Sequence, residues 1–226
     1  MVTEADRRTE EFLCGAISRL FPDANLVGEE FAREFDPRLP WTWVIDPIDG
    51  TDNYTQGTHY WCLSIGLLDH RLQPAAGIIY APRLDLLLFA DIGRPLEING
   101  REAAVFPPVK ELTSLSGLVI SSKILHFLDL RGFPGKLRIL GSSALQSCYP
   151  ACYPGAVAVL QEPQAFAWDI AAAHAILLAA GCRVAYYDGR PLDYGAMRVN
   201  RWNLEAIMVA SRPGAWDLLA RRIRPV

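Results

Sequence analysis

The chain has 226 residues, of which 51% are hydrophobic and 21% are charged, so it can bury a large core and is not a disordered chain. Its formal net charge of -3, with no run of Lys or Arg, excludes the electrostatics that nucleic-acid binding requires. No apolar run reaches the roughly 18 residues of a membrane span. Five Cys without CxxC spacing, and no signal-peptide pattern ahead of them, lead us to expect a cytoplasmic protein with reduced thiols.

The first 110 residues predict one helix followed by several strands. Apolar side chains recur at helical spacing from Phe12 to Leu20, and Pro22 ends that pattern. Strand patterns rich in aromatic and β-branched residues follow at 25–30, 41–46, 60–68, 74–82 and 84–91. The pair Asn99-Gly100 is typical of a hairpin turn. This order predicts an antiparallel meander covered by one helix.

The second half alternates between strand and helix patterns. Strand patterns occupy residues 117–122, 136–140, 155–161, 182–188 and 205–211. A helix begins near Ser142, a buried helix runs over 168–181, and a further helix lies at the C-terminal end. The alternation predicts a layered α/β half. We expect residues 1–110 and 111–226 to form two halves of one packed unit.

The segment WVIDPIDGTDN, residues 43–53, places acids directly after a hydrophobic strand pattern. Asp46 and Asp49 follow this strand, and Glu29 and Glu30 follow another. Strand ends are where α/β proteins hold ligands. Clustered carboxylates repel one another unless a cation lies between them, and oxygen ligands without His or Cys select Mg²⁺ or Mn²⁺. The pattern therefore indicates metal-assisted phosphate chemistry.

Two glycine-containing segments offer backbone N–H groups to an anion. A turn or helix that starts at Asp49 would point the N–H groups of Gly50 and Thr51 outward, where a phosphate can approach closely. GSSA, residues 141–144, offers a second helix start. Neither segment alone distinguishes a phosphate site from an ordinary turn or helix cap.

Taken together, these motifs resemble the inositol monophosphatase family. The stretches that carry the resemblance occur in the family's order: GEE (28–30), WVIDPIDGT (43–51), GSSA (141–144) and WDIAAAHAILLAAGC (168–182). The match runs from about Thr3 to the C-terminus. The resemblance implies a fructose-bisphosphatase-like fold of αβαβα layers, with an antiparallel-sheet half and an α/β half. It also implies a Mg²⁺-dependent, lithium-sensitive phosphomonoesterase.

The resemblance also assigns metal ligands residue by residue. It implies a first metal on Glu29, Asp46 and the backbone carbonyl of Ile48, and a second on Asp46, Asp49 and Asp169. A third, weaker ion would also depend on Glu29. Two to three Mg²⁺ ions, or Mn²⁺ in their place, would activate water for in-line attack, so no covalent enzyme intermediate is needed.

The remaining implied roles concern water and substrate. Thr51 and Asp6 would form a hydrogen-bonded pair near the attacking water, and with Glu29 they are the candidate catalytic residues. Gly50 and Thr51 would hold the phosphate. The alcohol part of the substrate would contact Gly141, Ser142, Ser143 and Glu162. Taken alone, Asp6 is typical of a solvated acid in a first helical turn, and Glu162 of a surface acid at a strand end.

The expected substrate is a small phosphorylated alcohol, with inositol monophosphate as the leading candidate. Relatives with the same metal motif act on fructose 1,6-bisphosphate, 3'-phosphoadenosine 5'-phosphate or histidinol phosphate, and TDNYTQGTHYW (51–61) favours the inositol branch over the nucleotidase branch. Family members are commonly dimers, so we expect a homodimer, with no nucleic-acid or membrane partner.

Two features depart from the family pattern. Its members usually begin with a further helix ahead of TEAD (3–6), so a non-catalytic member that binds metal or phosphate is the alternative hypothesis. The complete acid set argues against that alternative. Pro150 and Pro154 lie where the helix after Ser142 would continue, so we expect it to be kinked or shortened, which would shift Glu162.

Overall fold

The first half of the chain folds into a long helix and a seven-stranded sheet. The computed structural model describes residues 2–31 and 33–226. Helix α1 spans Glu4–Leu20, the short helix α2 spans Thr51–Thr55 and the 3-10 turn η1 spans Pro82–Leu84. The strands, in spatial order, are β1 (Ala24–Gly28), β2 (Trp41–Asp49), β3 (Cys62–Leu68), β4 (Pro74–Ala81), β5 (Leu86–Asp91), β6 (Glu97–Ile98) and β7 (Arg101–Glu102).

Most of this sheet is the predicted antiparallel meander, but one strand pair differs. Strands β2 to β7 pair antiparallel with their neighbours, and the predicted hairpin turn joins β6 to β7. Strand β1 instead runs parallel to β2, with Ala24 opposite Trp41. The prediction was wrong for this pair. The connection over residues 29–40 is long enough for the chain to return to the same end of the sheet, as a parallel pair requires.

The second half builds a five-stranded sheet in the order β10-β8-β11-β13-β12. Its strands are β8 (Gly117–Ile120), β10 (Lys136–Arg138), β11 (Ala156–Gln161), β12 (Arg183–Tyr186) and β13 (Met208–Ser211). Its helices are α3 (Ser143–Ser147), α4 (Tyr149–Cys152), α5 (Ala167–Ala179), α6 (Tyr194–Val199) and α7 (Ala215–Ala220), with a 3-10 turn η2 (Ile124–His126). A separate two-stranded pair joins β9 (Leu128–Asp129) to β14 (Arg224–Pro225).

The helix that begins after Ser142 is broken, as the two prolines predict. Helix α3 ends at Ser147, and α4 begins at Tyr149 with Pro150 in its first turn, where the missing N–H of proline costs little. The sequence did not predict α6 or the β9–β14 pair, because elements this short carry too little periodicity.

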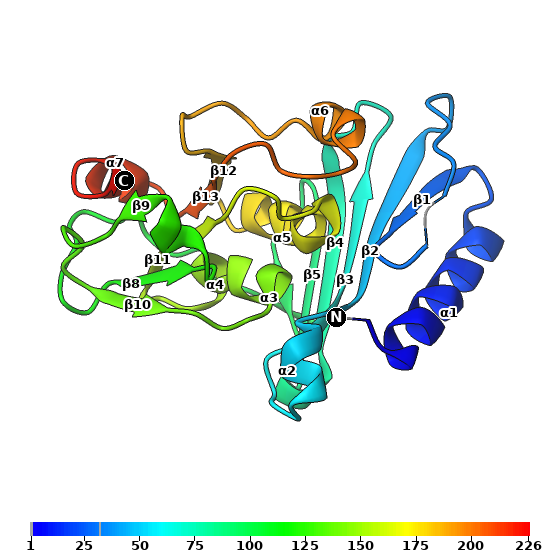
Figure 1. Cartoon of the computed structure of the whole chain (residues 1–226), viewed down its shortest axis with the longest axis horizontal. Helices are drawn as coiled ribbons and strands as arrows, with labels where there is room; N and C mark the ends of the chain where they lie inside the picture. The colour runs from blue at the N-terminus through cyan, green and yellow to red at the C-terminus, as the bar shows by residue number, and fades with distance from the viewer. Residues whose placement is uncertain (1, 32) are drawn as a thin grey trace.

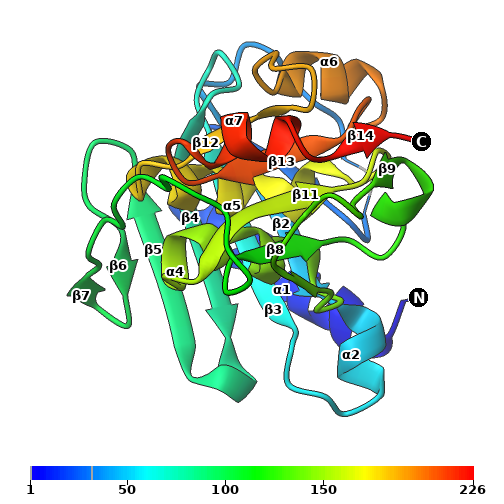
Figure 2. The same ribbon diagram turned by 90° about the vertical axis from the view of Figure 1, so that its left-hand side faces the viewer.

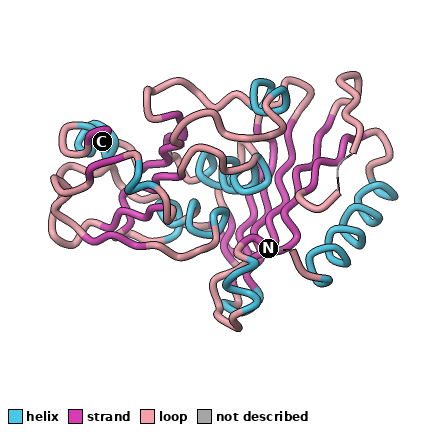
Figure 3. Tube along the Cα trace, in the orientation of Figure 1, coloured by secondary structure: helices cyan, strands magenta, loops and turns pink. Residues whose placement is uncertain are grey.

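Layers of helices and sheets alternate through the molecule (Figure 1). Helix α1 covers one face of the seven-stranded sheet, and α5 covers its other face, next to α3 and α4. The five-stranded sheet follows, and α7 packs on its far side. Figure 2 looks along this stack from the side of the five-stranded sheet, so the layers lie one behind another, and Figure 3 shows the view of Figure 1 by secondary structure. The predicted αβαβα order is confirmed.

Helix α5 belongs to the second half of the chain but rests on the first sheet. A Cβ atom on Gly77 of β4 would lie 2.3 Å from the Ala172 carbonyl oxygen, and one on Gly66 of β3 would lie 2.7 Å from the Ala171 Cβ. These glycines therefore let the helix backbone approach the strands closely, and this fixes where the first turn of α5 lies. No described helix has the length and apolar character needed to cross a membrane.

Candidate active site

An irregularity in strand β2 brings two predicted metal ligands to one place. Side chains three residues apart on a regular strand point to opposite faces. Here Asp46 pairs with Ser64, and Asp49 pairs with Cys62. Between these two pairs β2 therefore contains one more residue than β3. Such a bulge re-aims the side chains that follow it. Asp46 and Asp49 can therefore face the same space, and both are buried.

Helix α5 supplies the third carboxylate. Asp169 lies in its first turn, where one carboxylate oxygen accepts the backbone N–H of Phe166 at 2.6 Å. The helix start is tied to the sheet because Ser64 Oγ donates to the Trp168 carbonyl at 3.1 Å, and Ser64 is the residue opposite Asp46. Asp46, Asp49 and Asp169 each offer an oxygen within 4.8 Å of the others.

The electrostatics of this group favour a divalent cation. Burial raises the pKa of all three carboxyls, and for Asp46 and Asp169 the charge of Asp49 raises it further. None of the ion pairs among the described residues involves these three side chains. A hard cation held by oxygen ligands removes that repulsion, and Mg²⁺ or Mn²⁺ matches the donor set. The residues present therefore fit the metal that the sequence predicts.

Glu29 lies beside the three aspartates, on the loop after β1. Although the residue is solvent-exposed, loss of hydration among the surrounding protein atoms raises its pKa to about 7. A hydrogen bond with Asp46 opposes that rise, and the charge of Glu30 adds to it. Glu29 thus shares the electrostatic environment of the aspartates, although it is not part of the group whose oxygens lie within 4.8 Å.

The carboxylate of Asp49 is held from several directions. Its oxygens accept the backbone N–H groups of Ser143 and Ala144, each at 2.9 Å, and Ser142 Oγ donates a short hydrogen bond to Oδ2. The Cys62 thiol lies 3.6 Å from the same oxygen. The start of α3, where GSSA lies, is thus occupied by Asp49. These two N–H groups bind a protein carboxylate rather than a substrate phosphate.

Thr51 meets Asp6 across the site. Thr51 Oγ1 lies 3.3 Å from Asp6 Oδ1 and 3.1 Å from the Ile48 carbonyl oxygen, and it is the donor in both contacts. The other Asp6 oxygen accepts the Thr3 backbone N–H at 2.8 Å and the Thr3 hydroxyl, which caps α1. Asp6 is fully buried, so it is not the solvated first-turn acid of the alternative interpretation.

Two glycines let separate segments meet at the start of α2. Gly50 has φ of +91°, and a Cβ there would lie 3.0 Å from the Tyr60 carbonyl oxygen and 3.1 Å from that of Gly141. Asn53 Nδ2 donates to the carbonyls of Tyr60 and Leu140, each at 2.7 Å. The segment before α3 is thereby fixed against α2, with the first N–H groups of α2 next to the carboxylates.

A polar pocket of about 590 Å³ adjoins the carboxylates. Its lining includes Asp169, Ser143 and Glu162, together with Lys123, Gln161, Gln164 and Asn203. Glu162 Oε2 is buried and has no hydrogen-bond partner among the described residues. Gly141 and Ser142 do not line this pocket, and Ser142 is directed to Asp49 instead. The structure thus places Ser143 and Glu162 at the pocket, whereas Gly141 and Ser142 lie beside it.

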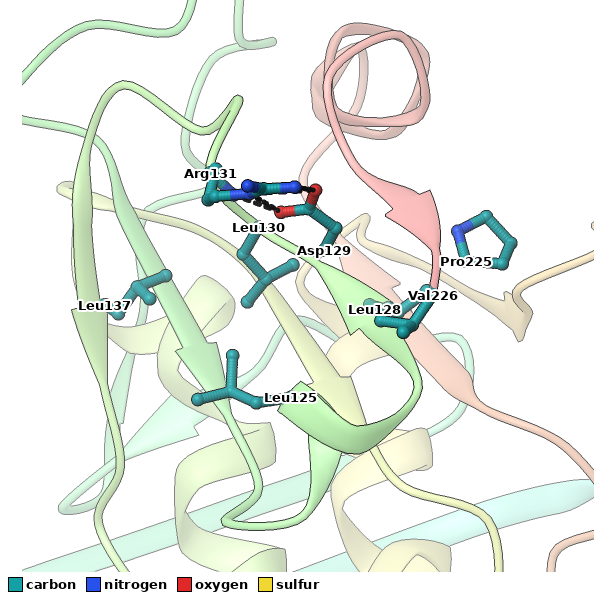
Figure 4. Close-up of a pocket in the computed structure, with 8 residues that line it drawn as sticks. All are labelled: Leu125, Leu128, Asp129, Leu130, Arg131, Leu137, Pro225 and Val226. Atoms are coloured by element: carbon teal, nitrogen blue, oxygen red, sulfur yellow. Dashed lines mark hydrogen bonds and ion pairs between the residues drawn. The ribbon is translucent and has the colours of Figure 1, made fainter.

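Another pocket among the described residues, slightly larger than this one, lies elsewhere. It measures about 620 Å³ and is lined mainly by leucines around η2, β9, β10 and the C-terminal residues (Figure 4). Its charged groups, Asp129 and Arg131, pair with each other at 2.6 Å. None of the predicted site residues lines it. Size alone therefore does not identify the chemical site in this fold.

Sequence reasoning missed several residues that support the site. Cys62 and Ser64 face Asp49 and the start of α5 from strand β3, and no motif marks them. Glu10 is fully buried on α1, and its carboxylate accepts N–H groups of the loop that carries Glu29. The sequence did contain a sign that Glu10 is buried, because it lies one helical turn after Asp6 and on the same helix face as the buried Cys14.

Comparisons with known proteins show the family and the fold to which the chain is similar. A model of the inositol monophosphatase family matches residues 1–212. The chain is 31% identical over 216 residues to inositol monophosphatase 3 of Solanum lycopersicum, covering 90% of this chain and 80% of that protein. It is 33% identical over 208 residues to a histidinol-phosphatase of Streptomyces coelicolor, covering 84% and 75%. The solved inositol monophosphatase from Anabaena (Nostoc) superposes with a TM-score of 0.83 at 27% identity, covering 98% of this chain and 86% of that one.

Proposed function

The chain belongs to the inositol monophosphatase family and is a phosphoric monoester hydrolase, and from this premise we propose that it hydrolyses inositol monophosphate in a Mg²⁺-dependent reaction. One observation carries the proposal: Asp46, Asp49 and Asp169 gather oxygens within 4.8 Å next to a pocket lined by polar side chains. The carboxylates suit the metal, and the pocket suits a polyhydroxylated alcohol.

We assign the metal ligands to these three aspartates, with Glu29 and the Ile48 carbonyl completing the set. Mg²⁺ bound by these residues would supply Lewis-acid chemistry, which would lower the pKa of a water and stabilise the leaving alkoxide. Mn²⁺ suits the same oxygen donors, and Li⁺ inhibition is expected from the family resemblance. Asp49 accepts hydrogen bonds from Ser142, Ser143 and Ala144, so the chain itself orients the carboxylate of this ligand.

Thr51 and Asp6 are assigned to the nucleophilic water. The Thr51 hydroxyl is turned toward Asp6 and the Ile48 carbonyl, so its lone pairs remain available to accept a proton from a water. The carboxylate of Asp6 can then take up the proton that Thr51 gives away. Glu29, which shares a hydrogen bond with Asp46, completes the proposed catalytic set.

The substrate contacts follow from the surrounding segments. The N–H groups of Gly50 and Thr51 begin α2 beside the carboxylates and are assigned to the phosphate. Ser143 and Glu162 line the pocket and are assigned to the alcohol. Gly141 and Ser142 stay proposed as neighbours of the alcohol, although the Ser142 hydroxyl is directed to Asp49.

One observation favours histidinol phosphate as a second candidate substrate. The buried, unpartnered oxygen of Glu162 lies in a pocket with Asp169, and it can accept a hydroxyl or an ammonium group. Histidinol phosphate carries an ammonium group and inositol phosphate does not. The variant Glu162→Gln therefore separates the two: removing the charge impairs recognition of the amine far more than that of a neutral polyol.

The test is phosphate release from inositol 1-phosphate, fructose 1,6-bisphosphate, 3'-phosphoadenosine 5'-phosphate and histidinol phosphate, with and without Mg²⁺. Asp46→Asn is the inactive variant, and Asp52→Asn, an exposed aspartate in the first turn of α2, is the matched control. We expect Mg²⁺-dependent release that Asp46→Asn abolishes and Asp52→Asn retains. No release by folded wild-type protein would instead favour the non-catalytic hypothesis.

We also propose that residues 1–110 and 111–226 act as one unit, that the protein is a cytoplasmic homodimer and that Mg²⁺ is its physiological ion. Two contacts between the halves support the single unit: Asp49 accepts a hydrogen bond from the first turn of α3, and α5 packs closely on the first sheet. The free state of Cys14, Cys62, Cys148, Cys152 and Cys182 suits a reducing compartment. Light scattering tests the dimer, and cell fractionation tests the compartment.

A further inference from the structure

The carboxylate of Glu10 is buried under the loop that carries Glu29. Glu10 has no exposed surface, although it is an acid on a surface helix. Its Oε2 accepts the backbone N–H of Glu30 at 2.8 Å, and its Oε1 accepts that of Phe31 at 3.1 Å. The loop after β1 is therefore anchored to α1 through two backbone groups that directly follow Glu29.

Gly28 makes room for this anchor. A Cβ atom on Gly28 would lie 2.2 Å from Glu10 Oε1 and 2.4 Å from its Cδ. The backbone of Gly28 does not have a positive φ, so space rather than backbone conformation explains the glycine. The last residue of β1 and the carboxylate of Glu10 thus fit against each other directly before Glu29.

A buried acid at this point needs a reason, since burying a carboxylate is unfavourable unless it is hydrogen-bonded. An apolar residue would leave the N–H groups of Glu30 and Phe31 without an acceptor. The carboxylate supplies two acceptors in one plane, so it fixes the direction of the loop as well as its position. Asp6 lies one turn earlier on the same helix and contacts Thr51.

We propose that Glu10 is a positioning residue for the metal site, which holds the Glu29 loop against Asp46 by binding the backbone of Glu30 and Phe31. Helix α1 then positions two parts of the site: Glu10 holds the Glu29 loop, and Asp6 holds Thr51. This inference rests on the proposed function, because it takes Glu29 as a metal ligand.

The primary test is calorimetric titration of Mg²⁺ into the purified protein, combined with amide hydrogen exchange. Glu10→Gln keeps the size of the side chain but turns an NH₂ donor toward one of the two N–H groups. We expect Mg²⁺ affinity to fall by about 10- to 100-fold. We also expect faster exchange of the Glu30 and Phe31 amides in metal-free protein, and an unchanged KM at saturating Mg²⁺. Glu11→Gln, an exposed neighbour on α1, is the matched control and should change none of these.

A second variant reaches the same contact from the other side. Gly28→Ala would push the Glu10 carboxylate away from the loop, so it should weaken Mg²⁺ binding in the same way. In a Glu10→Ala background the obstruction is gone, and adding Gly28→Ala should cost little more. This non-additive result distinguishes a shared contact from two unrelated losses of stability. It also decides the question if Glu10→Gln does not fold.

The outcomes separate this inference from the proposed function. Wild-type affinity for Mg²⁺ and unchanged exchange of the two amides in Glu10→Gln would overturn the positioning role alone. Wild-type protein that binds no Mg²⁺ would overturn the proposed function and, with it, the link from Glu10 to the metal. Weaker Mg²⁺ binding with faster exchange at Glu30 and Phe31, absent in Glu11→Gln, would support the proposal.

Discussion

Asp49 and Ser143 are 94 residues apart in the sequence, and the Asp49 carboxylate accepts the backbone N–H of Ser143 at 2.9 Å. This bond joins the end of a strand in the first sheet to the first turn of a helix packed against the second. A carboxylate at a helix start also interacts favourably with the helix dipole. The contact that orients a proposed metal ligand therefore also holds the two halves of the chain together.

The first prediction concerns Ser142→Ala. The variant removes the hydroxyl that donates to Asp49 but leaves the backbone donors of Ser143 and Ala144. We expect Mg²⁺ affinity to fall by about tenfold, as for other groups that orient a metal ligand, with KM for the substrate nearly unchanged at saturating Mg²⁺. Titration calorimetry and steady-state kinetics measure the two effects.

Ser143→Ala is the control for that experiment. It keeps the backbone bond to Asp49 and removes only a hydroxyl that accepts a hydrogen bond from Gln161 at the pocket. It should raise KM and leave Mg²⁺ affinity as it is. The reverse result, a raised KM and normal Mg²⁺ affinity in Ser142→Ala, would assign Ser142 to substrate contact instead.

The second prediction compares Thr51→Ser with Thr51→Val. Serine keeps the hydroxyl that donates toward Asp6 and the Ile48 carbonyl, whereas valine has a similar shape without it. If Thr51 orients and deprotonates the water, Thr51→Val should lower kcat by about a hundredfold or more, and Thr51→Ser should lose much less. A valine variant with near-normal kcat at saturating Mg²⁺ would remove Thr51 from the proton path.

The third prediction is a pH dependence of stability that comes from His174. Burial lowers its pKa from the usual 6.5 to about 4, and its Nδ1 lies 3.2 Å from the Tyr194 hydroxyl. Because the unfolded state binds the proton first, stability present above pH 6.5 is lost as the pH falls toward 4. Between pH 7 and pH 5 this histidine should reduce the free energy of unfolding by about 2 kcal/mol.

Urea unfolding at several pH values measures that contribution. His174→Gln should flatten the loss of stability between pH 7 and pH 5, even if the variant is less stable throughout. His70→Gln, at an exposed position, should leave the pH profile unchanged. An equally steep acid loss in His174→Gln would assign the effect to other groups.

Much of the fold could be predicted because its main elements have clear periodicity. The strands of the meander, helix α5 and the break at Pro150 all follow from local sequence. The parallel pairing of β1 could not be predicted, since direction depends on where the following connection returns. Helix α6 is too short for a helical period to register, although Asp193 caps it by accepting the Ala196 N–H at 3.0 Å.

The site, too, could be predicted only in part from the sequence. Spacing placed the acids at strand ends, but a regular strand would have sent Asp46 and Asp49 to opposite faces, and only the pairing with β3 reveals the bulge. The GSSA segment predicted a helix start correctly, yet its partner is a carboxylate of the chain itself. Which group fills a helix start depends on tertiary contacts that no local pattern contains.

The last prediction is that Gly77→Ala disrupts the seat of α5 and with it the position of Asp169. A Cβ at Gly77 would lie 2.3 Å from the Ala172 carbonyl oxygen, a backbone atom that cannot rotate away as a side chain would. Overpacking of this kind costs about 1–3 kcal/mol or more, so we expect a lower free energy of unfolding and weaker Mg²⁺ binding in the folded fraction.

Gly15→Ala is the control with the opposite expected effect. A Cβ there has its nearest contact at 3.8 Å, and replacing a glycine within α1 should stabilise the protein by about 0.5–1 kcal/mol. Unfolding curves for the two variants should therefore shift in opposite directions, and a Gly77→Ala protein as stable as wild type would show that α5 can move away from β4 without cost.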